Sequence, residues 1–296
     1  MIIGKLKTFW KLLKRTYVSW DNNNPFGKSA IIAYYTLFAL PSLLMIVVSI
    51  AGYFFGMDAV RGRVVQKIGG LIGEGVSQAI EGMIANAALN KSSTFNVVLG
   101  IVMLIFGATG VFVQLKMAMN AIWNVKAKEN TFLGTLIDRL ISFGMVLVLG
   151  FLSLVSLTLS VVLNVLSDYI GKIAPQIAAI MANVFSFTLS FVVITGLFSA
   201  IFKWLPDITI RWKTTILGAS LTTALFLVGE SLMGLYFSTS DPTSVYGGSS
   251  SVVLILLWVY YTGIILFFGA EFTYQYAKYR KEKVGPNKNS VVDVEK

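Results

Sequence analysis

Six long stretches without charged residues constrain the fold of this chain more than any other feature of its sequence. Each stretch runs for 24 to 30 residues without Asp, Glu, Lys or Arg, except that one of them contains a single Glu. A helix that crosses a bilayer needs roughly 20 such residues, whereas a strand of a membrane barrel needs only about 10. We therefore predict an all-α integral membrane protein with six transmembrane helices. The predicted spans lie near residues 29–56, 93–115, 140–166, 177–202, 215–237 and 248–270.

The positive charges of the chain are divided unevenly between the two sides of the predicted membrane. Only 13% of the residues are charged, which is about half of what a water-soluble surface needs. The chain has 24 Lys and Arg residues, and 19 of them lie in segments on the amino-terminal side, against 5 on the opposite side. Because basic residues are enriched in cytoplasmic loops, we predict that both termini lie in the cytoplasm.

Residues 1–28 precede the first span and contain the pattern of an amphipathic helix. Over residues 2–20, apolar and aromatic residues fall on one helical face and basic residues occupy much of the remainder. The pattern favours a helix that lies on the inner leaflet of the membrane. A helix packed against the protein's own inner face is an alternative. The apolar face holds Ile2, Leu6, Phe9, Leu13, Tyr17 and Trp20, and the basic residues are Lys5, Lys7, Lys11, Lys14 and Arg15.

Two other segments complete the domain organisation around a six-helix domain of residues 29–270. Segment 58–91, between the first and second spans, has apolar residues at helical spacing, so we expect an external amphipathic helical segment there, acting as a lid or an interfacial belt. Residues 271–296 form a polar cytoplasmic tail that contains Gly285 and Pro286. We expect this tail to be partly disordered, because it has little apolar surface to bury.

Glu230 is the only ionisable residue inside a predicted span. A carboxylate there costs roughly 2.5–3.5 kcal/mol on insertion scales. Since no other span supplies a Lys or Arg, we expect the carboxyl to keep its proton. One interpretation is a proton- or cation-coupled site that faces a polar cavity. The alternative is a protonated carboxyl that bonds to a neighbouring Ser, Thr or Tyr and only fixes helix packing.

The first predicted span is more polar than a lipid-facing helix. Pro41 lies near its middle and leaves the carbonyl of Leu37 without its usual donor. Tyr34 and Tyr35 precede this proline by less than two turns. Such a helix either lines a cavity or carries an ordinary proline kink that its neighbours satisfy.

Further cavity candidates lie at the inner ends of the second and last spans. Lys116, Asn120 and Trp123 share one face of the helix that continues the second span, and Glu271 closes the last span on the same side. A buried Lys116–Glu271 pair and separate contacts with lipid headgroups are both compatible with this pattern.

The outer loop over residues 238–251 is rich in turn residues and contains Tyr246. A loop of this kind either lines the mouth of a cavity or simply connects two helices. Tyr260 follows it in the last span. We count both tyrosines as candidates for the same cavity.

The residue types that most enzymes need are missing from the chain. It has no Cys and no His, no nucleophile or phosphate-binding motif, and no clustered pair of acidic residues that would hold Mg²⁺. We therefore predict that the protein is not an enzyme, uses no cofactor or metal, and does not act on nucleic acid.

Short motifs in a fixed order make the chain similar to a known family over roughly residues 25–276. It resembles the YihY/BrkB family of bacterial inner-membrane proteins, which once carried the label ribonuclease BN. The resemblance implies a six-helix protein of the cytoplasmic membrane and brings no established substrate. The motifs are Ala33-Tyr34-Tyr35, Leu40-Pro41, Ala118-Met119-Asn120-Ala121-Ile122-Trp123, Leu205-Pro206, Trp212-Lys213, Gly218-Ala219, Tyr236, Tyr246-Gly247, Trp258-Val259-Tyr260 and Gly269-Ala270-Glu271.

Three functions are compatible with these features. The polar first and last spans, Glu230 and the amphipathic periphery favour a transporter or lipid-handling protein. Its expected partners are membrane lipids, and an anionic or lipid-like substrate fits the basic inner surface. A structural or partner-binding membrane scaffold is the first alternative, and an intramembrane enzyme is the second.

Overall fold

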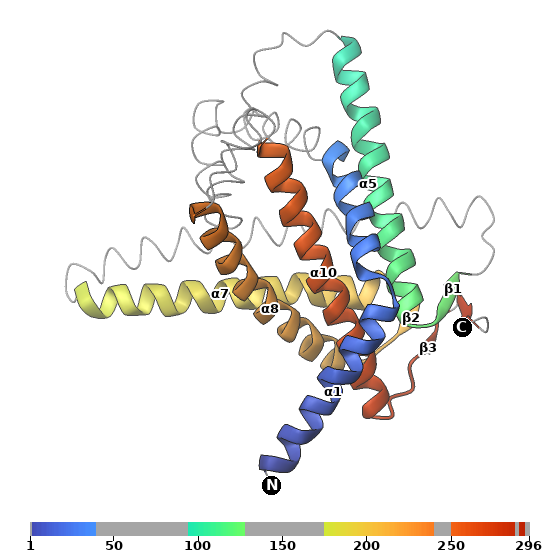
Figure 1. Ribbon diagram of the computed structural model, residues 1–296, viewed down its shortest axis with the longest axis vertical. Helices are drawn as coiled ribbons and strands as arrows, with labels where there is room; N and C mark the ends of the chain where they lie inside the picture. The colour runs from blue at the N-terminus through green and yellow to red at the C-terminus, as the bar shows by residue number, and fades with distance from the viewer. Residues whose placement is uncertain (1, 40–93, 128–174, 240–249, 288–289, 294–296) are drawn as a thin grey trace. The chain divides into compact units, whose positions relative to one another are not determined.

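The described part of the chain is mostly helical. A computed structural model describes residues 2–39, 94–127, 175–239, 250–287 and 290–293 (Figure 1). The helices are α1 (Ile2–Asn22), an unlabelled helix over residues 25–39, α5 (Thr94–Ile122), α7 (Pro175–Trp204), α8 (Trp212–Thr239) and α10 (Ser250–Tyr279). The strands are β1 (Val125–Ala127), β2 (Ile208–Thr209), β3 (Gly285–Pro286) and β4 (Ser290–Val292).

Long helices occupy four of the six predicted spans, and the helix over residues 25–39 covers the start of another. The four, α5, α7, α8 and α10, have 28 to 30 residues each, or roughly 42–45 Å of length. In the part of the chain that the structure describes, three stretches are long and apolar enough to cross a membrane. They are Phe187–Trp204, Trp212–Tyr236 and Val252–Tyr279. The predicted helical character and three apolar helices of spanning length are therefore present, whereas span 140–166, most of span 29–56 and segment 58–91 lie outside the described residues.

The last helix continues beyond the predicted end of its span. We expected the span to end near residue 270, but α10 runs to Tyr279. Lys281 has a positive φ of 52°, its N–H donates to the carbonyl of Lys278, and the N–H of Glu282 donates to the carbonyl of Ala277. This left-handed cap satisfies the last carbonyls of the helix. Uncharged length marks where the apolar layer ends, whereas capping decides where the helix ends.

The chain forms two compact units whose segments alternate along the sequence. Unit 1 contains residues 1–20, 119–224 and 268–296, and unit 2 contains residues 21–118 and 225–267. Helices α5, α8 and α10 each contribute residues to both units.

In unit 1, α8 and α10 meet through glycines and threonines. A side chain at Gly218 would collide with Thr273, and a side chain at Gly269 would collide with Thr222. Each threonine hydroxyl donates within its own helix, from Thr222 to the Gly218 carbonyl at 2.8 Å and from Thr273 to the Gly269 carbonyl at 2.7 Å. The polar groups are therefore satisfied internally while the backbones approach closely, as small residues allow in membrane helices.

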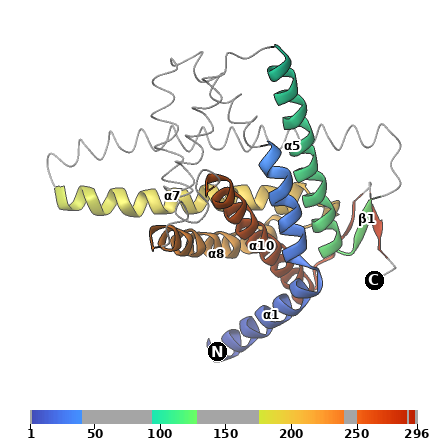
Figure 2. The same cartoon turned by 45° about the horizontal axis from the view of Figure 1, so that its top comes forward.

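In unit 2, the helix over residues 25–39 packs on α5 and α10. Asn24, at φ 50°, accepts a bond from the N–H of Gly27 on its side chain and so caps the start of this helix, with Pro25 as its first residue. Figure 1 and Figure 2 both show the helix beside α5. A Cβ at Gly107 or Gly110 of α5 would meet this helix, so the glycines permit the close contact.

Helix α1 packs part of its surface against α10 within unit 1. Leu12, Thr16 and Trp20 are buried at one-turn intervals along the helix. The ring of Trp20 lies 5.9 Å from that of Phe268, and the ring of Phe9 lies 6.2 Å from that of Phe272. The predicted helix is therefore present. Its side with Leu12, Thr16 and Trp20 packs against the protein itself, as the alternative interpretation expects.

The described residues of the carboxyl-terminal tail include two short strands, in a segment that the sequence predicts to be partly disordered. Strand β4 pairs antiparallel with β1, with Lys126 opposite Val291, and β3 pairs antiparallel with β2. These short ladders join residues more than 70 positions apart along the chain. Such long-range pairing leaves no local hydrophobic pattern by which the sequence could reveal it.

Candidate functional site

Asn120 and Asp207 form a buried pair in unit 1. Asn120 lies near the end of α5, and Asp207 lies in the short connection between α7 and α8. The Asn120 side-chain NH₂ donates to Oδ2 of Asp207 at 2.9 Å, and the backbone N–H of Asp207 donates to Oδ1 of Asn120 at 2.8 Å. Each residue is only 6% exposed. Because both ends of the amide are used, the pair holds the α7–α8 connection against the end of α5.

The carboxyl-terminal tail closes over this pair. The backbone N–H of Asn287 donates to the carbonyl of Asp207 at 3.0 Å, and the Ser290 hydroxyl donates to the same carbonyl. The Asn287 side chain reaches Oδ1 of Asp207 at 3.5 Å. We call Asn120, Asp207, Asn287 and Ser290 the Asp207 cluster. It connects segments that lie about 80 or more residues apart along the chain.

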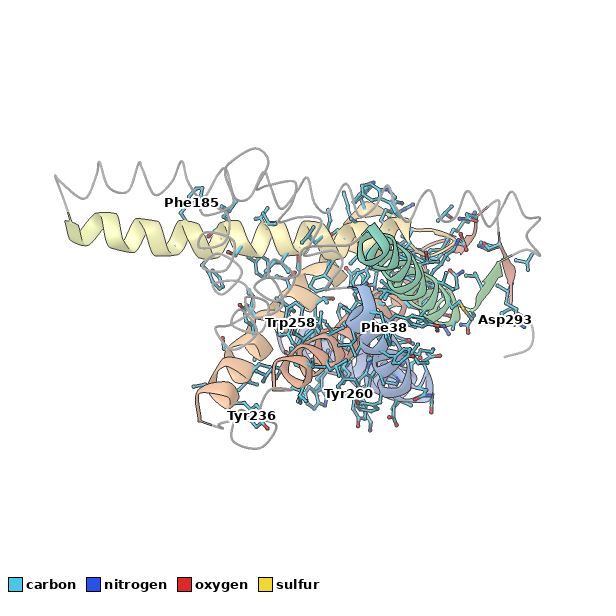
Figure 3. All side chains as sticks on the ribbon, turned by 90° about the horizontal axis from the view of Figure 1, so that it is seen from above. Phe38, Phe185, Tyr236, Trp258, Tyr260 and Asp293 are labelled. Carbon is cyan, nitrogen blue, oxygen red and sulfur yellow. The ribbon has the colours of Figure 1, made fainter. Side chains whose placement is uncertain are left out.

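A second set of contacts fixes the tail beside the cluster. The Asn124 side chain donates to the hydroxyl of Tyr274 at 3.0 Å, and the ring of Trp123 lies 5.2 Å from that of Tyr274. The backbone N–H of Asp293, which is labelled in Figure 3, donates to the carbonyl of Asn124 at 2.9 Å, and its carboxylate lies 3.0 Å from the Lys126 ammonium. The end of α5 and the end of the tail therefore hold each other in place.

This arrangement is suited to holding the connections between the helices together. Both carboxyl oxygens of Asp207 accept protein hydrogen bonds, and the chain has neither His nor Cys. Among the residues that the structure describes, no group of three or more metal-ligating side chains comes together.

Sequence reasoning found one member of the Asp207 cluster and missed three. Asn120 is predicted as a cavity residue because it shares a helical face with Lys116. Asp207 had a usable signal, because it is the single acidic residue in the otherwise basic segment 203–213. Asn287 and Ser290 had none, since polar residues after Gly285-Pro286 are typical of a disordered tail.

Glu230 lies on α8 and is half-buried in unit 2. Its neighbour Gly229 faces Tyr261 of α10 so closely that a Cβ there would collide with the phenol hydroxyl. That hydroxyl donates to the carbonyl of Leu225, one turn earlier on α8, at 3.2 Å. Glu230 is also close enough to Tyr261 to interact with it electrostatically. Glu230 therefore follows directly after the position where α8 and the Tyr261 phenol of α10 touch.

The other predicted cavity residues are distributed over several elements. Tyr34 is exposed, with its ring 5.7 Å from that of Tyr35 and 5.0 Å from that of Phe38. Tyr35 is half-buried and fits against Gly110. Tyr260 is half-buried on α10 (Figure 3). Pro41 and Tyr246 lie outside the described residues.

Glu271 is fully buried on α10 and accepts a hydrogen bond from the Gln275 side chain at 3.0 Å. It belongs to unit 1, whereas the half-buried Lys116 belongs to unit 2. The Lys116–Glu271 pair that the sequence allows therefore stays a prediction.

The sequence of this chain is similar to a known protein family and to several membrane proteins. A family model described as Virulence factor BrkB matches residues 16–293, which include both Glu230 and the Asp207 cluster. A UPF0761 membrane protein of Rhodospirillum centenum is 27% identical over 289 residues, which are 95% of this chain and 61% of the relative. A UPF0761 membrane protein of Albidiferax ferrireducens is 26% identical over 266 residues, which are 88% of this chain and 61% of the relative. The chain thus spans 61% of the length of these two relatives.

A relative of similar length carries a different name. The ribonuclease-like protein YfkH of Bacillus subtilis is 22% identical over 283 residues, which cover 94% of this chain and 98% of that protein. No solved structure matches the chain.

Proposed function

Because the chain belongs to the virulence factor BrkB family, we propose that it is a multi-pass transporter or lipid-handling protein of the cytoplasmic membrane. Relatives that match most of the chain are named membrane proteins. Three described stretches have the length and apolarity of membrane spans. These observations support the membrane setting, and the polar groups within the spans support movement of a substrate.

The observation that carries the proposal is the carboxyl of Glu230 beside Tyr261. It lies within Trp212–Tyr236, which is apolar enough to cross a membrane. An ionisable residue inside a membrane is expensive and usually marks a substrate path or a proton relay. We infer that Glu230 takes up and releases a proton during transport, with Tyr261 as its polar neighbour on α10.

The charge of the protein supports an anionic or lipid-like substrate. The segments on the amino-terminal side of the spans hold 19 of the 24 Lys and Arg residues. A positive surface raises the local concentration of anions, including phosphate-bearing lipid headgroups.

The proposal is tested with purified protein in liposomes that contain a fluorescent phosphatidylglycerol. Added dithionite bleaches only the outer leaflet, so a protein that moves lipid lets the bleaching continue into the inner-leaflet pool. A parallel set of liposomes, loaded with a small fluorescent organic anion, reports release of soluble substrates. Protein-free liposomes are the control. If neither probe moves at any pH, in protein that is shown to be folded, the proposal is wrong.

We propose that both termini lie in the cytoplasm, on the strength of the uneven Lys and Arg count. The chain has no native Cys, so single cysteines report cleanly. A cysteine at Glu81 is expected to react with an impermeant thiol reagent in intact cells, and a cysteine at Lys288 is expected to react only after permeabilisation. The reverse pattern would show that the orientation is inverted.

A membrane scaffold is the second candidate function, and the close helix packing favours it. Gly107, Gly110, Gly218 and Gly269 each face a neighbouring helix with no room for a side chain. Tight contacts of this kind build a rigid bundle. If the protein is a scaffold, neither liposome probe should move, and replacing the carboxyl of Glu230 should not change the protein's function.

We propose that the protein is not a ribonuclease, although one relative is named ribonuclease-like. Cleaving RNA requires a group that activates water or holds a metal. The chain has no His, and among the described residues no three metal-ligating side chains come together. Purified protein is expected to leave labelled RNA intact, with or without Mg²⁺. Cleavage that copurifies with the chain and disappears in Glu230→Gln or Glu271→Gln would contradict this proposal.

A further inference from the structure

The surface of α1 that faces away from α10 combines large aromatic rings with positive charge. Trp10 is 72% exposed and Tyr17 is 57% exposed. The two residues lie seven positions apart, so their side chains project within about 20° of each other around the helix. The buried residues Leu12, Thr16 and Trp20 occupy a different side of the helix. One side of α1 is therefore covered by its own unit, while this surface is not.

Four exposed cations lie beside the two rings. They are Lys7, Lys11, Lys14 and Arg15, and the one acidic residue of α1 is Asp21 in its last turn, which leaves a net positive surface. This arrangement differs from the single apolar face that the sequence predicts. Phe9 and Trp20 pack on α10, whereas Tyr17 lies at the edge of the basic surface, with its ring 5.7 Å from that of Trp20.

Exposed aromatic rings beside cations fit the headgroup level of an anionic membrane. Trp and Tyr favour the headgroup level of a membrane, where the ring is buried and its polar edge stays wet. Lys and Arg are attracted to a leaflet of anionic lipids, and each cation near the surface shifts binding by about five-fold. A hydrophobic protein partner would not require the charges. A membrane surface is favoured over a nucleic acid because α1 belongs to a chain with helices apolar enough to cross a membrane.

We propose that Trp10, Tyr17, Lys7, Lys11, Lys14 and Arg15 form a docking surface for the headgroups of anionic phospholipids. Helix α1 then has two attachments, one to α10 through Phe9 and Trp20 and one to the membrane surface. This inference does not depend on transport, because it concerns how the amino-terminal helix is held. It also specifies the lipid, since zwitterionic headgroups carry no net charge for the four cations.

The test uses the full chain in nanodiscs of phosphatidylcholine, with and without phosphatidylglycerol. A cysteine at Val18, which is exposed on the basic surface, carries an environment-sensitive fluorophore. Spin-labelled lipids that quench at headgroup depth then report docking. We expect strong quenching only with phosphatidylglycerol. Neutralising Lys7, Lys11, Lys14 and Arg15 to Gln should lower the ratio of docked to undocked helix more than about ten-fold.

The matched control removes four exposed cations elsewhere in unit 1, by changing Lys278, Arg280, Lys281 and Lys283 to Gln. It should change docking less than two-fold, because these residues are not on α1. Trp10→Ser should weaken quenching at constant charge. Equal quenching in both nanodisc types, or equal losses in the two four-residue variants, would overturn the proposal. Elution as a single species and an unchanged helix signal show that each variant is folded.

Discussion

Glu230→Gln is expected to abolish the pH dependence of substrate movement while the protein still folds and inserts. Glutamine keeps the shape and the hydrogen-bonding capacity of the carboxyl but cannot bind or release a proton. The residue is half-buried beside Tyr261, so the substitution removes titration with little change in packing. The measurement is the rate of probe movement in liposomes between pH 5 and pH 8, for the wild type and the variant, at equal protein density.

Further substitutions separate coupling from structure at this position. Glu230→Ala should lose movement as well, because it also removes the titrating carboxyl, while the Tyr261 hydroxyl keeps its bond to the Leu225 carbonyl. The control is Ser231→Ala, whose exposed hydroxyl donates only to its own helix at Leu227. Wild-type movement by Glu230→Gln across the pH range would reject proton coupling, and the scaffold would become the preferred function.

Asp207→Ala is expected to lower the free energy of unfolding by about 2–4 kcal/mol, because it leaves buried donors without acceptors. The Asn120 side-chain NH₂ would lose its bond in a site that is only 6% exposed. Asn287 would lose its side-chain contact with the carboxyl as well. We expect a lower melting temperature in detergent and faster trypsin cleavage after Lys283, since the tail is held through this cluster.

Asp293→Ala is the matched control for the Asp207 cluster. It removes another acidic residue that connects the tail to the end of α5, but its partner Lys126 is half exposed. A pair of this kind contributes about 1 kcal/mol or less. Equal melting temperatures for Asp207→Ala and Asp293→Ala would show that the buried network does not hold the tail.

The sequence alone determined the membrane class and the positions of four long helices. Runs of 24 to 30 uncharged residues coincide with α5, α7, α8 and α10, because insertion into lipid depends on the sum of local hydropathy over a single segment. Helix α1 was predictable for the same reason, since its apolar spacing lies within 20 consecutive residues. Glu230 was visible because a lone charge contrasts with its apolar surroundings.

Tertiary structure alone decided which polar and small residues meet. The Asp207 cluster joins the end of α5, the α7–α8 connection and the tail, and the glycines of α8 and α10 face the threonines of the opposite helix. Tertiary packing also divided the aromatic residues of α1 between α10 and the exposed surface. A hydrogen bond or a close backbone contact depends on a partner that is distant along the chain, so no local pattern encodes it. Hydropathy is additive along one segment and can be read from it, whereas complementarity exists only between segments that folding has brought together.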